Sequence, residues 1–325
     1  MKKNVYPFKP TVLVLLSCYN GQAYLKEQLD SILTQKNCNV ELLIRDDGSV
    51  DDTVSILKEY EYHYSKSGGS VKILPVLYGK NLGVIRSFFI LLQQASVLQY
   101  DYYALADQDD IWMEHKLSHA VKTLEKECRK KKSNIKTFPC LYAGAVQPVD
   151  ATGKRLSTGM SYSKVRPSFG NALIENICTG CTCVFSKGLL SLLKEKTPNF
   201  VIMHDFWLYL VAAAFGTVIY DPQPYVFYRQ HENNTVGMAI TRLENYKRRL
   251  KNFKRHRGQL SKQAGEFFKI YKNVIPKEKK QLTKLLIKNK RDKTIRKQLL
   301  FEKRIYRQNW KDDFIFRIFG LFGLL

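Results

Sequence analysis

The first hundred residues alternate between short apolar runs and amphipathic segments. Residues 11–16 form a continuous apolar run, typical of a strand buried on both faces of a parallel sheet. Residues 24–35 then carry apolar side chains at helical spacing. The same succession repeats, with strands predicted at 40–44, 71–77 and 102–106 and helices predicted from 51 to 60 and after Gly83. This alternation predicts an α/β fold with a doubly wound sheet flanked by helices.

The second half of the chain is less regular. A strand is predicted within residues 171–185, an apolar helix from Met203 to Gly216, and short strands at 218–220 and 226–228. The remainder predicts long basic helices, interrupted at Pro276.

The net charge of +24 is distributed very unevenly along the chain. Between Arg242 and Lys311 there are 25 Lys and Arg residues against 5 Asp and Glu, a surplus of 20, so the rest of the chain is nearly balanced. We therefore divide the chain into a domain over residues 1–238 and a basic helical extension over residues 239–325.

The chain ends in an apolar run, residues 314–325, rich in Phe and Leu. A dozen residues are too few to span a bilayer, which takes about 20, but they suit an interfacial anchor. The neighbouring cations favour an anionic membrane surface as partner. Docking of this run on the rest of the chain or on a partner subunit is the alternative. Nucleic acid is not expected as a partner, because the extension carries no nucleic-acid-binding motif.

Seven cysteines, an odd number, are scattered along the chain, and residues 1–10 lack the apolar core of a secretory signal. Reduced thiols in a cytoplasm are therefore expected. Cys178, Cys181 and Cys183 are close enough to suggest a metal site, but no second Cys or His pair completes one.

Polar segments follow three of the predicted strands, at residues 17–21, 46–49 and 107–110. Ligands of doubly wound sheets bind beyond the carboxyl ends of the strands, so these segments are expected to converge on one site. The three aspartates within 107–110 repel one another unless a cation lies between them, and oxygen ligands suit Mg²⁺ or Mn²⁺ shared with substrate phosphates. The alternative is an acidic turn in which Asp110 caps a following helix. The glycine patterns of dinucleotide-binding folds and phosphate-loop NTPases are absent.

These segments, in their order and spacing, resemble the family 2 inverting glycosyltransferases. The motifs are Ser-Cys-Tyr-Asn-Gly at 17–21, Arg-Asp-Asp-Gly-Ser at 45–49, Asn-Leu-Gly-Val at 81–84 and Ala-Asp-Gln-Asp-Asp at 106–110. Three more are similar to a bacterial rhamnosyltransferase-type branch: Thr-Gly-Cys-Thr at 179–182, Met-His-Asp-Phe-Trp at 203–207 and Tyr-Arg-Gln-His-Glu-Asn-Asn at 228–234. The resemblance covers about residues 10–237. It implies a GT-A fold with a mixed sheet, a nucleotide-diphosphate sugar donor and a divalent cation, Mg²⁺ or Mn²⁺.

The resemblance also implies which residues hold the donor. Ser17 and Tyr19 would line the nucleotide pocket, and Asp47 would accept a hydrogen bond from the N3–H of the base. Gly180 and Cys181 would let the chain approach the donor sugar closely. A turn with helix capping is the alternative role of Asp47.

Metal and diphosphate contacts are carried over in the same way. Asp109 would ligate the cation, Asp107 would approach the metal or the ribose, and His231 would contact the metal or the diphosphate. Arg229 would contact the diphosphate. A structural role is the alternative for Arg229 and His231.

An inverting sugar transfer is a single in-line displacement, so it needs one base to take the proton of the acceptor hydroxyl. Asp205 matches the catalytic acidic residue of the family. Its apolar neighbours Phe206 and Trp207 favour partial desolvation, which keeps a carboxylate basic. Helix capping is the alternative role of Asp205, and His204 is the less favoured base.

The prediction is a metal-dependent inverting glycosyltransferase on the cytoplasmic face of a bacterial inner membrane, with a lipid-linked saccharide as acceptor. The rhamnosyltransferase branch implies dTDP-L-rhamnose as donor, with UDP-galactose, UDP-glucose and similar donors as alternatives. A processive synthase is disfavoured, because the chain lacks transmembrane segments and a Gln-x-x-Arg-Trp motif. The competing class is a non-enzymatic basic binding protein on a degenerate transferase scaffold, against which Asp109 and Asp205 argue.

Overall fold

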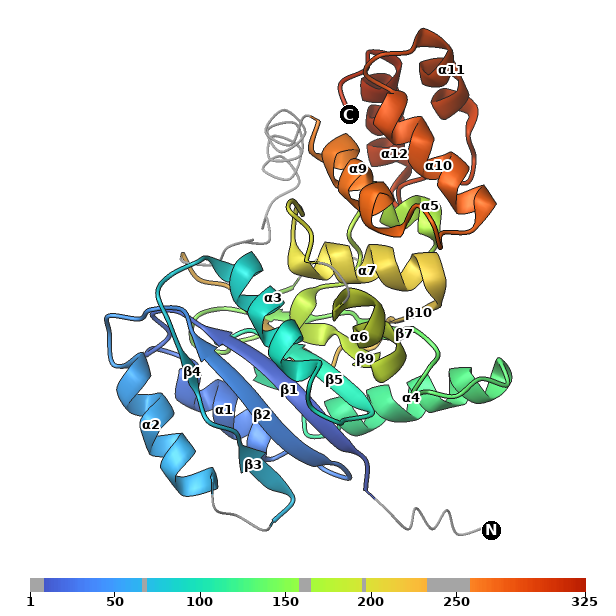
Figure 1. Cartoon of the computed structure of the whole chain (residues 1–325). Coiled ribbons are helices and arrows are strands. Elements are labelled where there is room, and N and C mark those ends of the chain that lie inside the picture. Colours follow the sequence, from blue (N-terminus) through green and yellow to red (C-terminus); the bar gives the residue numbers. More distant parts are fainter. Residues whose placement is uncertain (1–8, 66–68, 158–164, 195–196, 233–257) are drawn as a thin grey trace.

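The computed structural model describes residues 9–65, 69–157, 165–194, 197–232 and 258–325. Within these residues the main sheet has eight strands: β1 (Thr11–Cys18), β2 (Asn39–Asp46), β3 (Val71–Ile73), β4 (Leu77–Tyr78), β5 (Tyr102–Ala106), β7 (Cys140–Gly144), β9 (Val184–Ser186) and β10 (Thr217–Asp221). Their order is β10-β7-β9-β5-β1-β2-β3, with β4 also paired to β2 (Figure 1). Strand β9 runs antiparallel to β5 and β7, and the other pairs are parallel. The predicted mixed, doubly wound sheet is confirmed.

Helices cover both faces of this sheet because its central strands are apolar on both sides. Val12, Val14 and Leu16 of β1 are fully buried against one set of helices, whereas Leu13 and Leu15 are fully buried against the other. The first set is α1 (Leu25–Leu33), α2 (Thr53–Tyr64) and α4 (Lys116–Lys130). The second set is α3 (Val84–Ala95), α6 (Lys187–Lys194) and α7 (His204–Phe215).

A small second sheet brings a distant strand to the end of β5. Its strands are β6 (Ile111–Trp112), β11 (Val226–Arg229) and β8 (Gln147–Val149), in the order β6-β11-β8. Strand β6 begins directly after Asp110, so this sheet places the end of β11 beside residues 107–110.

The C-terminal helices pack beyond α7 and the short helix α5 (Phe169–Ala172), at the end of the molecule away from α2 and β3 (Figure 1). They are α9 (Gln259–Tyr271), α10 (Lys277–Lys288), α11 (Lys293–Phe301) and α12 (Trp310–Leu321). Pro276 directly precedes α10, as the predicted break requires. None of the helices in the described ranges is long and apolar enough to cross a bilayer.

These helices share one hydrophobic core with the sheet domain. Phe267, Leu286 and Phe316 are fully buried in the same cluster as the side chains of α7. Gly170 of α5 touches the chain between α11 and α12, since a Cβ at Gly170 would lie 1.8 Å from the carbonyl oxygen of Arg304. The first part of the predicted extension, residues 239–257, lies outside the described residues.

Three local predictions are corrected by the structure. The strand predicted at 71–77 is two strands, β3 and β4, separated around Pro75, which has no N–H to give to a ladder. Most of 171–185 is not a strand. Residues Gly180–Thr182 form the 3₁₀ turn η1, in which the Cys183 N–H donates to the Gly180 carbonyl oxygen at 2.9 Å. Asp110 caps no helix, because β6 follows it and α4 begins only at Lys116.

Candidate active site

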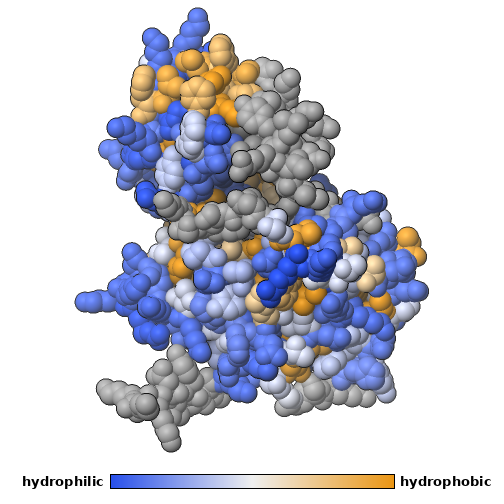
Figure 2. Space-filling model, turned by 180° about the vertical axis from the view of Figure 1, so that it is seen from behind, coloured by the Kyte–Doolittle hydropathy of each residue, from blue (hydrophilic) through white to orange (hydrophobic). Residues whose placement is uncertain are grey.

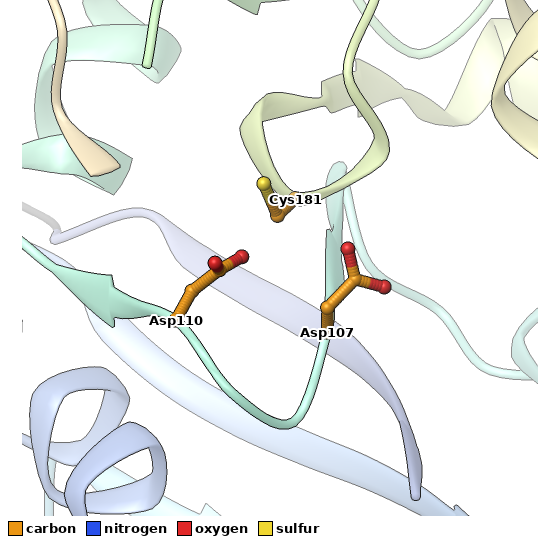
Figure 3. Close-up of side chains that lie close together, drawn as sticks. All are labelled: Asp107, Asp110 and Cys181. Carbon is orange, nitrogen blue, oxygen red and sulfur yellow. The ribbon is translucent and has the colours of Figure 1, made fainter. Parts of the chain in front are cut away.

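The acidic segment at the end of β5 meets the turn η1 from the other half of the domain. Asp107, Asp110 and Cys181 each bring one ligand atom to within 4.8 Å of the others (Figure 3). Burial raises the pKa of both carboxyls, and the neighbouring carboxylates raise it further. One oxygen of Asp110 is buried without a hydrogen-bond partner among the described residues. Such a cluster favours a cation.

Asp109, from the same segment, contacts His231, which follows β11. The Nε2 atom of His231 lies 2.9 Å from Oδ2 of Asp109, and the ring packs on Tyr24 with 4.9 Å between centroids. The two side chains remain partly accessible, at 12% for His231 and 16% for Asp109. The structure therefore brings together the two residues predicted to share a metal.

Hydrogen bonds from Arg229 connect the end of β11 to the acidic segment. Its guanidinium donates to the carbonyl oxygens of Asp109 at 2.9 Å and Ala151 at 2.8 Å, and it forms an ion pair with Glu27. Its backbone N–H donates to Asp110 at 3.2 Å. Because the side chain is buried and bonded in this way, these contacts are those of the structural alternative. The diphosphate contact stays a prediction.

Asp205 lies in the first turn of α7, with its carboxylate turned toward η1. The Gly180 N–H donates to its Oδ2 at 3.0 Å, and the Phe206 N–H donates to its Oδ1 at 2.7 Å. Burial raises the pKa of Asp205 to about 6. Its charge is also among those that raise the pKa of Asp107. The N-cap of α7 is Met203, so Asp205 does not occupy the capping position.

His204 differs from Asp205 although the two are adjacent. Its ring stacks on Phe88 with 3.9 Å between centroids, and neither ring nitrogen has a hydrogen-bond partner among the described residues. Burial lowers its pKa to about 3. A base needs a pKa near the working pH, so this environment favours Asp205 over His204.

Gly180 allows this packing. A Cβ there would lie 3.2 Å from Nε2 of His204 and 3.6 Å from Oδ2 of Asp205. A side chain at this position would therefore crowd His204 and lie in van der Waals contact with Asp205.

Hydrogen bonds fix the two loops that are predicted to hold the nucleotide. Ser17 ends β1 with its Oγ 2.6 Å from Oγ of Ser87. Asp47 is buried, pairs with Arg45, and accepts from the N–H groups of Leu82 at 3.0 Å and Gly83 at 2.8 Å. The predicted Asn-Leu-Gly segment is thus held by Asp47.

Tyr19 is 45% exposed, and both its backbone N–H and its carbonyl oxygen bond to the side chain of Gln108. The Tyr19 N–H donates to Oε1 of Gln108 at 2.7 Å, and Nε2 of Gln108 donates back to the Tyr19 carbonyl oxygen at 3.0 Å. Gln108 lies between Asp107 and Asp109 in the sequence, and this position was the only sign that it belongs to the site. Glu27, the partner of Arg229, is 202 residues away from it and gave no such signal.

All seven cysteines are free and buried. Cys181 lies with Asp107 and Asp110, whereas Cys178 and Cys183 pack in the hydrophobic core on the α7 face of the sheet. Among the described residues, the three sulfurs therefore do not form a common metal site.

Comparisons with known proteins show which families and folds this chain resembles. The model of the family described as Glycosyl transferase family 2 matches residues 13–130. The dTDP-rhamnosyl transferase RfbG of Shigella flexneri is 30% identical over 240 residues, 72% of this chain and 77% of that protein. The putative glycosyltransferase EpsE of Bacillus subtilis (strain 168) is 36% identical over 117 residues, 36% of this chain and 39% of that protein.

Two solved structures share the fold. The S. aureus TarS fragment 1–349 with UDP-GlcNAc has a TM-score of 0.51 at 16% identity, covering 86% of each chain. The mannosyltransferase PcManGT from Pyrobaculum calidifontis with GDP-Man and Mn²⁺ has a TM-score of 0.51 at 15% identity, covering 97% of this chain and 85% of that one. Both are glycosyltransferases of the GT-A type, so the predicted fold is confirmed.

Proposed function

The chain belongs to glycosyl transferase family 2, and from that premise we propose that it transfers L-rhamnose from dTDP-L-rhamnose by a metal-dependent inverting reaction. The proposed acceptor is a lipid-linked bacterial surface polysaccharide. The observation that carries the chemistry is the contact of Asp109, at the end of β5, with His231 after β11, at 2.9 Å. The choice of donor is supported by the identity to a dTDP-rhamnosyl transferase.

The residues at the end of β5 fit Mg²⁺ or Mn²⁺. Asp109 and His231, with Asp107 beside them, offer two carboxylates and an imidazole, and carboxylate oxygens are preferred ligands of both cations. Two of these side chains remain accessible, which leaves room for phosphate oxygens. When bound, the cation would neutralise negative charge on the departing nucleoside diphosphate.

Asp205 is the proposed base that takes the proton of the acceptor hydroxyl. The two backbone N–H groups that bond its carboxylate fix its orientation. A pKa of about 6 keeps the carboxylate ionised at neutral pH yet more basic than an exposed one.

Ser17, Tyr19 and Asp47 are the proposed nucleotide contacts, and Gly180 and Cys181 the proposed neighbours of the sugar. A carboxylate has about four lone-pair positions. Asp47 therefore retains acceptor capacity for the N3–H of a base beside its bonds to Leu82 and Gly83. Thymine and uracil both carry this N3–H, so a UDP-sugar is the alternative donor.

Residues 1–238 are the proposed catalytic domain, and residues 239–325 the basic helical extension. A lipid-linked acceptor would place the enzyme on the cytoplasmic face of the inner membrane. No nucleic acid is part of the proposed function.

Donor binding tests the proposal. Calorimetric titration with dTDP-L-rhamnose, UDP-galactose, UDP-glucose and GDP-mannose would be run in Mn²⁺ and in EDTA. We expect the tightest binding for dTDP-L-rhamnose, only with the metal, and its loss in Asp109→Asn. Tighter binding of a UDP-sugar would make that sugar nucleotide the donor in place of dTDP-L-rhamnose. Absence of binding to every donor would favour the non-enzymatic class.

A further inference from the structure

The last helix of the chain presents an apolar stripe to solvent. Its large side chains at positions i, i+4, i+8 and i+11 lie on one side of α12, and two more phenylalanines adjoin them. We refer to this set as the C-terminal apolar face: Phe301, Trp310, Phe314, Ile318, Leu321 and Phe322, which are 39–77% exposed. Figure 2 shows hydrophobic surface gathered at the C-terminal end of the molecule, with hydrophilic residues around it.

The opposite side of α12 is part of the protein core. Phe316 is fully buried and Leu325 is 3% exposed. The side chain of Asn289 donates to the Gly320 carbonyl oxygen at 2.8 Å, and a Cβ at Gly320 would lie 3.3 Å from Leu299. Because this side is fixed, α12 cannot turn its outer side chains inward without leaving the core.

Arg317 joins the end of α11 to the same face. Its guanidinium donates to the carbonyl oxygens of Leu299 at 3.0 Å, Leu300 at 2.7 Å and Ile305 at 2.6 Å. These bonds hold the C-terminal end of α11, and with it Phe301, against α12. The apolar face is therefore a fixed surface built from two helices.

The charge around this face is positive. Residues 258–325 contain 18 Lys and Arg against 6 Asp and Glu. Lys293, Lys297 and Lys303 are exposed on or next to α11, and Nζ of Lys311 lies 5.5 Å from the ring centroid of Trp310. The two acids of α12 face inward: Asp312 is buried and Asp313 pairs with Arg317.

We propose that the C-terminal apolar face docks the enzyme on an anionic lipid bilayer. Aromatic and aliphatic side chains on one helix face, beside exposed lysines, match the chemistry of the boundary between anionic headgroups and acyl chains. A second copy of this chain fits less well, since pairing the faces would bring two strongly basic surfaces together. The inference rests on the proposed function only in that a lipid-linked acceptor makes membrane docking useful.

The apolar run that the sequence predicts as an anchor therefore has two sets of side chains, one buried in the protein and one exposed. Phe316 and Leu325 stabilise the protein, and only the outer side chains are available for lipid. Deleting residues 314–325 would remove both sets and unfold the C-terminal helices. Point substitutions on the outer face are therefore the informative change.

The test is co-sedimentation of the full chain with vesicles of phosphatidylcholine alone and of phosphatidylcholine mixed with phosphatidylglycerol. We expect wild type to bind the mixed vesicles only. The double variant Phe314→Ser, Phe322→Ser should bind them about tenfold more weakly or worse. Val274→Ser is the matched control, since Val274 is 64% exposed on the extension but outside the face, and should bind as wild type does.

Three results would overturn the inference: wild type that stays in the supernatant, a double variant that binds as wild type does, or equal binding to vesicles without phosphatidylglycerol. Sedimentation velocity tests the alternative that a second copy of this chain covers the face. If wild type is a dimer and the double variant is a monomer, the face is a subunit interface. Titration with dTDP-L-rhamnose on the same proteins keeps the two proposals apart. Lipid binding without donor binding would leave docking standing and remove the proposed reaction.

Discussion

Around the end of β5, four aspartates are held inside the protein or in partly covered positions, whereas most of the lysines of α10 to α12 are exposed. Burial and mutual repulsion raise the pKa of Asp107, Asp110 and Asp205. Water and salt screen the exposed lysines of the extension from one another. Under the two proposals, the concentrated charge of the first region serves chemistry at a small site, and the dispersed charge of the second serves contact with a large surface.

The two regions nevertheless depend on one core, and they meet at α5. The side chain of Asn171 donates to the Tyr306 carbonyl oxygen at 3.0 Å, and the Gln308 N–H donates to Glu175 at 2.7 Å. Substitutions can therefore disrupt the catalytic region, the surface region or the contact between them. Each kind should change a different measured property: turnover, lipid binding or stability.

The largest expected effect comes from Asp205→Asn. Loss of a general base lowers a rate about 10²- to 10⁴-fold, and affinity for dTDP-L-rhamnose should stay near that of wild type. Turnover assays and calorimetry on the same sample measure both. Asp101→Asn, in an exposed pair with Lys136, is the control and should leave both unchanged. Loss of donor binding in Asp205→Asn would contradict its role as base.

The pH dependence of turnover should separate Asp205 from His204. Below the pKa of about 6 the carboxyl of Asp205 is protonated and cannot accept a proton, so the rate should fall about tenfold per pH unit. Above it the rate should level off. His204→Phe should keep this acidic limb, since His204 is neutral throughout the range. If the fall in rate at acidic pH disappears in His204→Phe, the group that titrates is His204 and not Asp205.

A smaller effect is expected where the two regions meet. Gly170→Ala places a Cβ against the Arg304 carbonyl oxygen and should lower the free energy of unfolding by about 1–3 kcal/mol. Gly265→Ala is the matched control, because a Cβ there meets nothing within 4 Å and lies on α9, where alanine is favoured over glycine by up to about 1 kcal/mol. Thermal unfolding compares the two variants. Equal stability of both would show that α5 and the extension are not in close contact.

The strands at 11–16, 40–44 and 102–106 could be predicted because burial on both faces leaves continuous apolar runs in the sequence. Residues 107–110 stood out for a similar reason, since three aspartates so close together are unusual. Residues 178–183 were wrongly predicted as part of a strand, because alternating small and apolar residues are compatible with one. Local bonds such as that from the Thr182 hydroxyl to the Thr179 carbonyl oxygen, at 2.7 Å, favour a turn instead.

Contacts between distant segments could not be predicted from the sequence. No pattern in the sequence near Arg229 predicts its pairing with Glu27. The same holds for α12, because α10 and α11 determine which of its apolar side chains are buried. Strands β7 and β8 and helix α4 were not predicted, although their burial pattern is that of ordinary core elements.

The central claim is that Asp109 and a divalent cation support sugar transfer from dTDP-L-rhamnose. The most direct measurement is the rate of dTDP release from this donor, with a lipid extract supplying acceptor, by wild type and Asp109→Asn in Mn²⁺ and in EDTA. We predict release by wild type in Mn²⁺ only, with Asp109→Asn falling to the EDTA level. Release that persists in EDTA, or in Asp109→Asn, would contradict the claim.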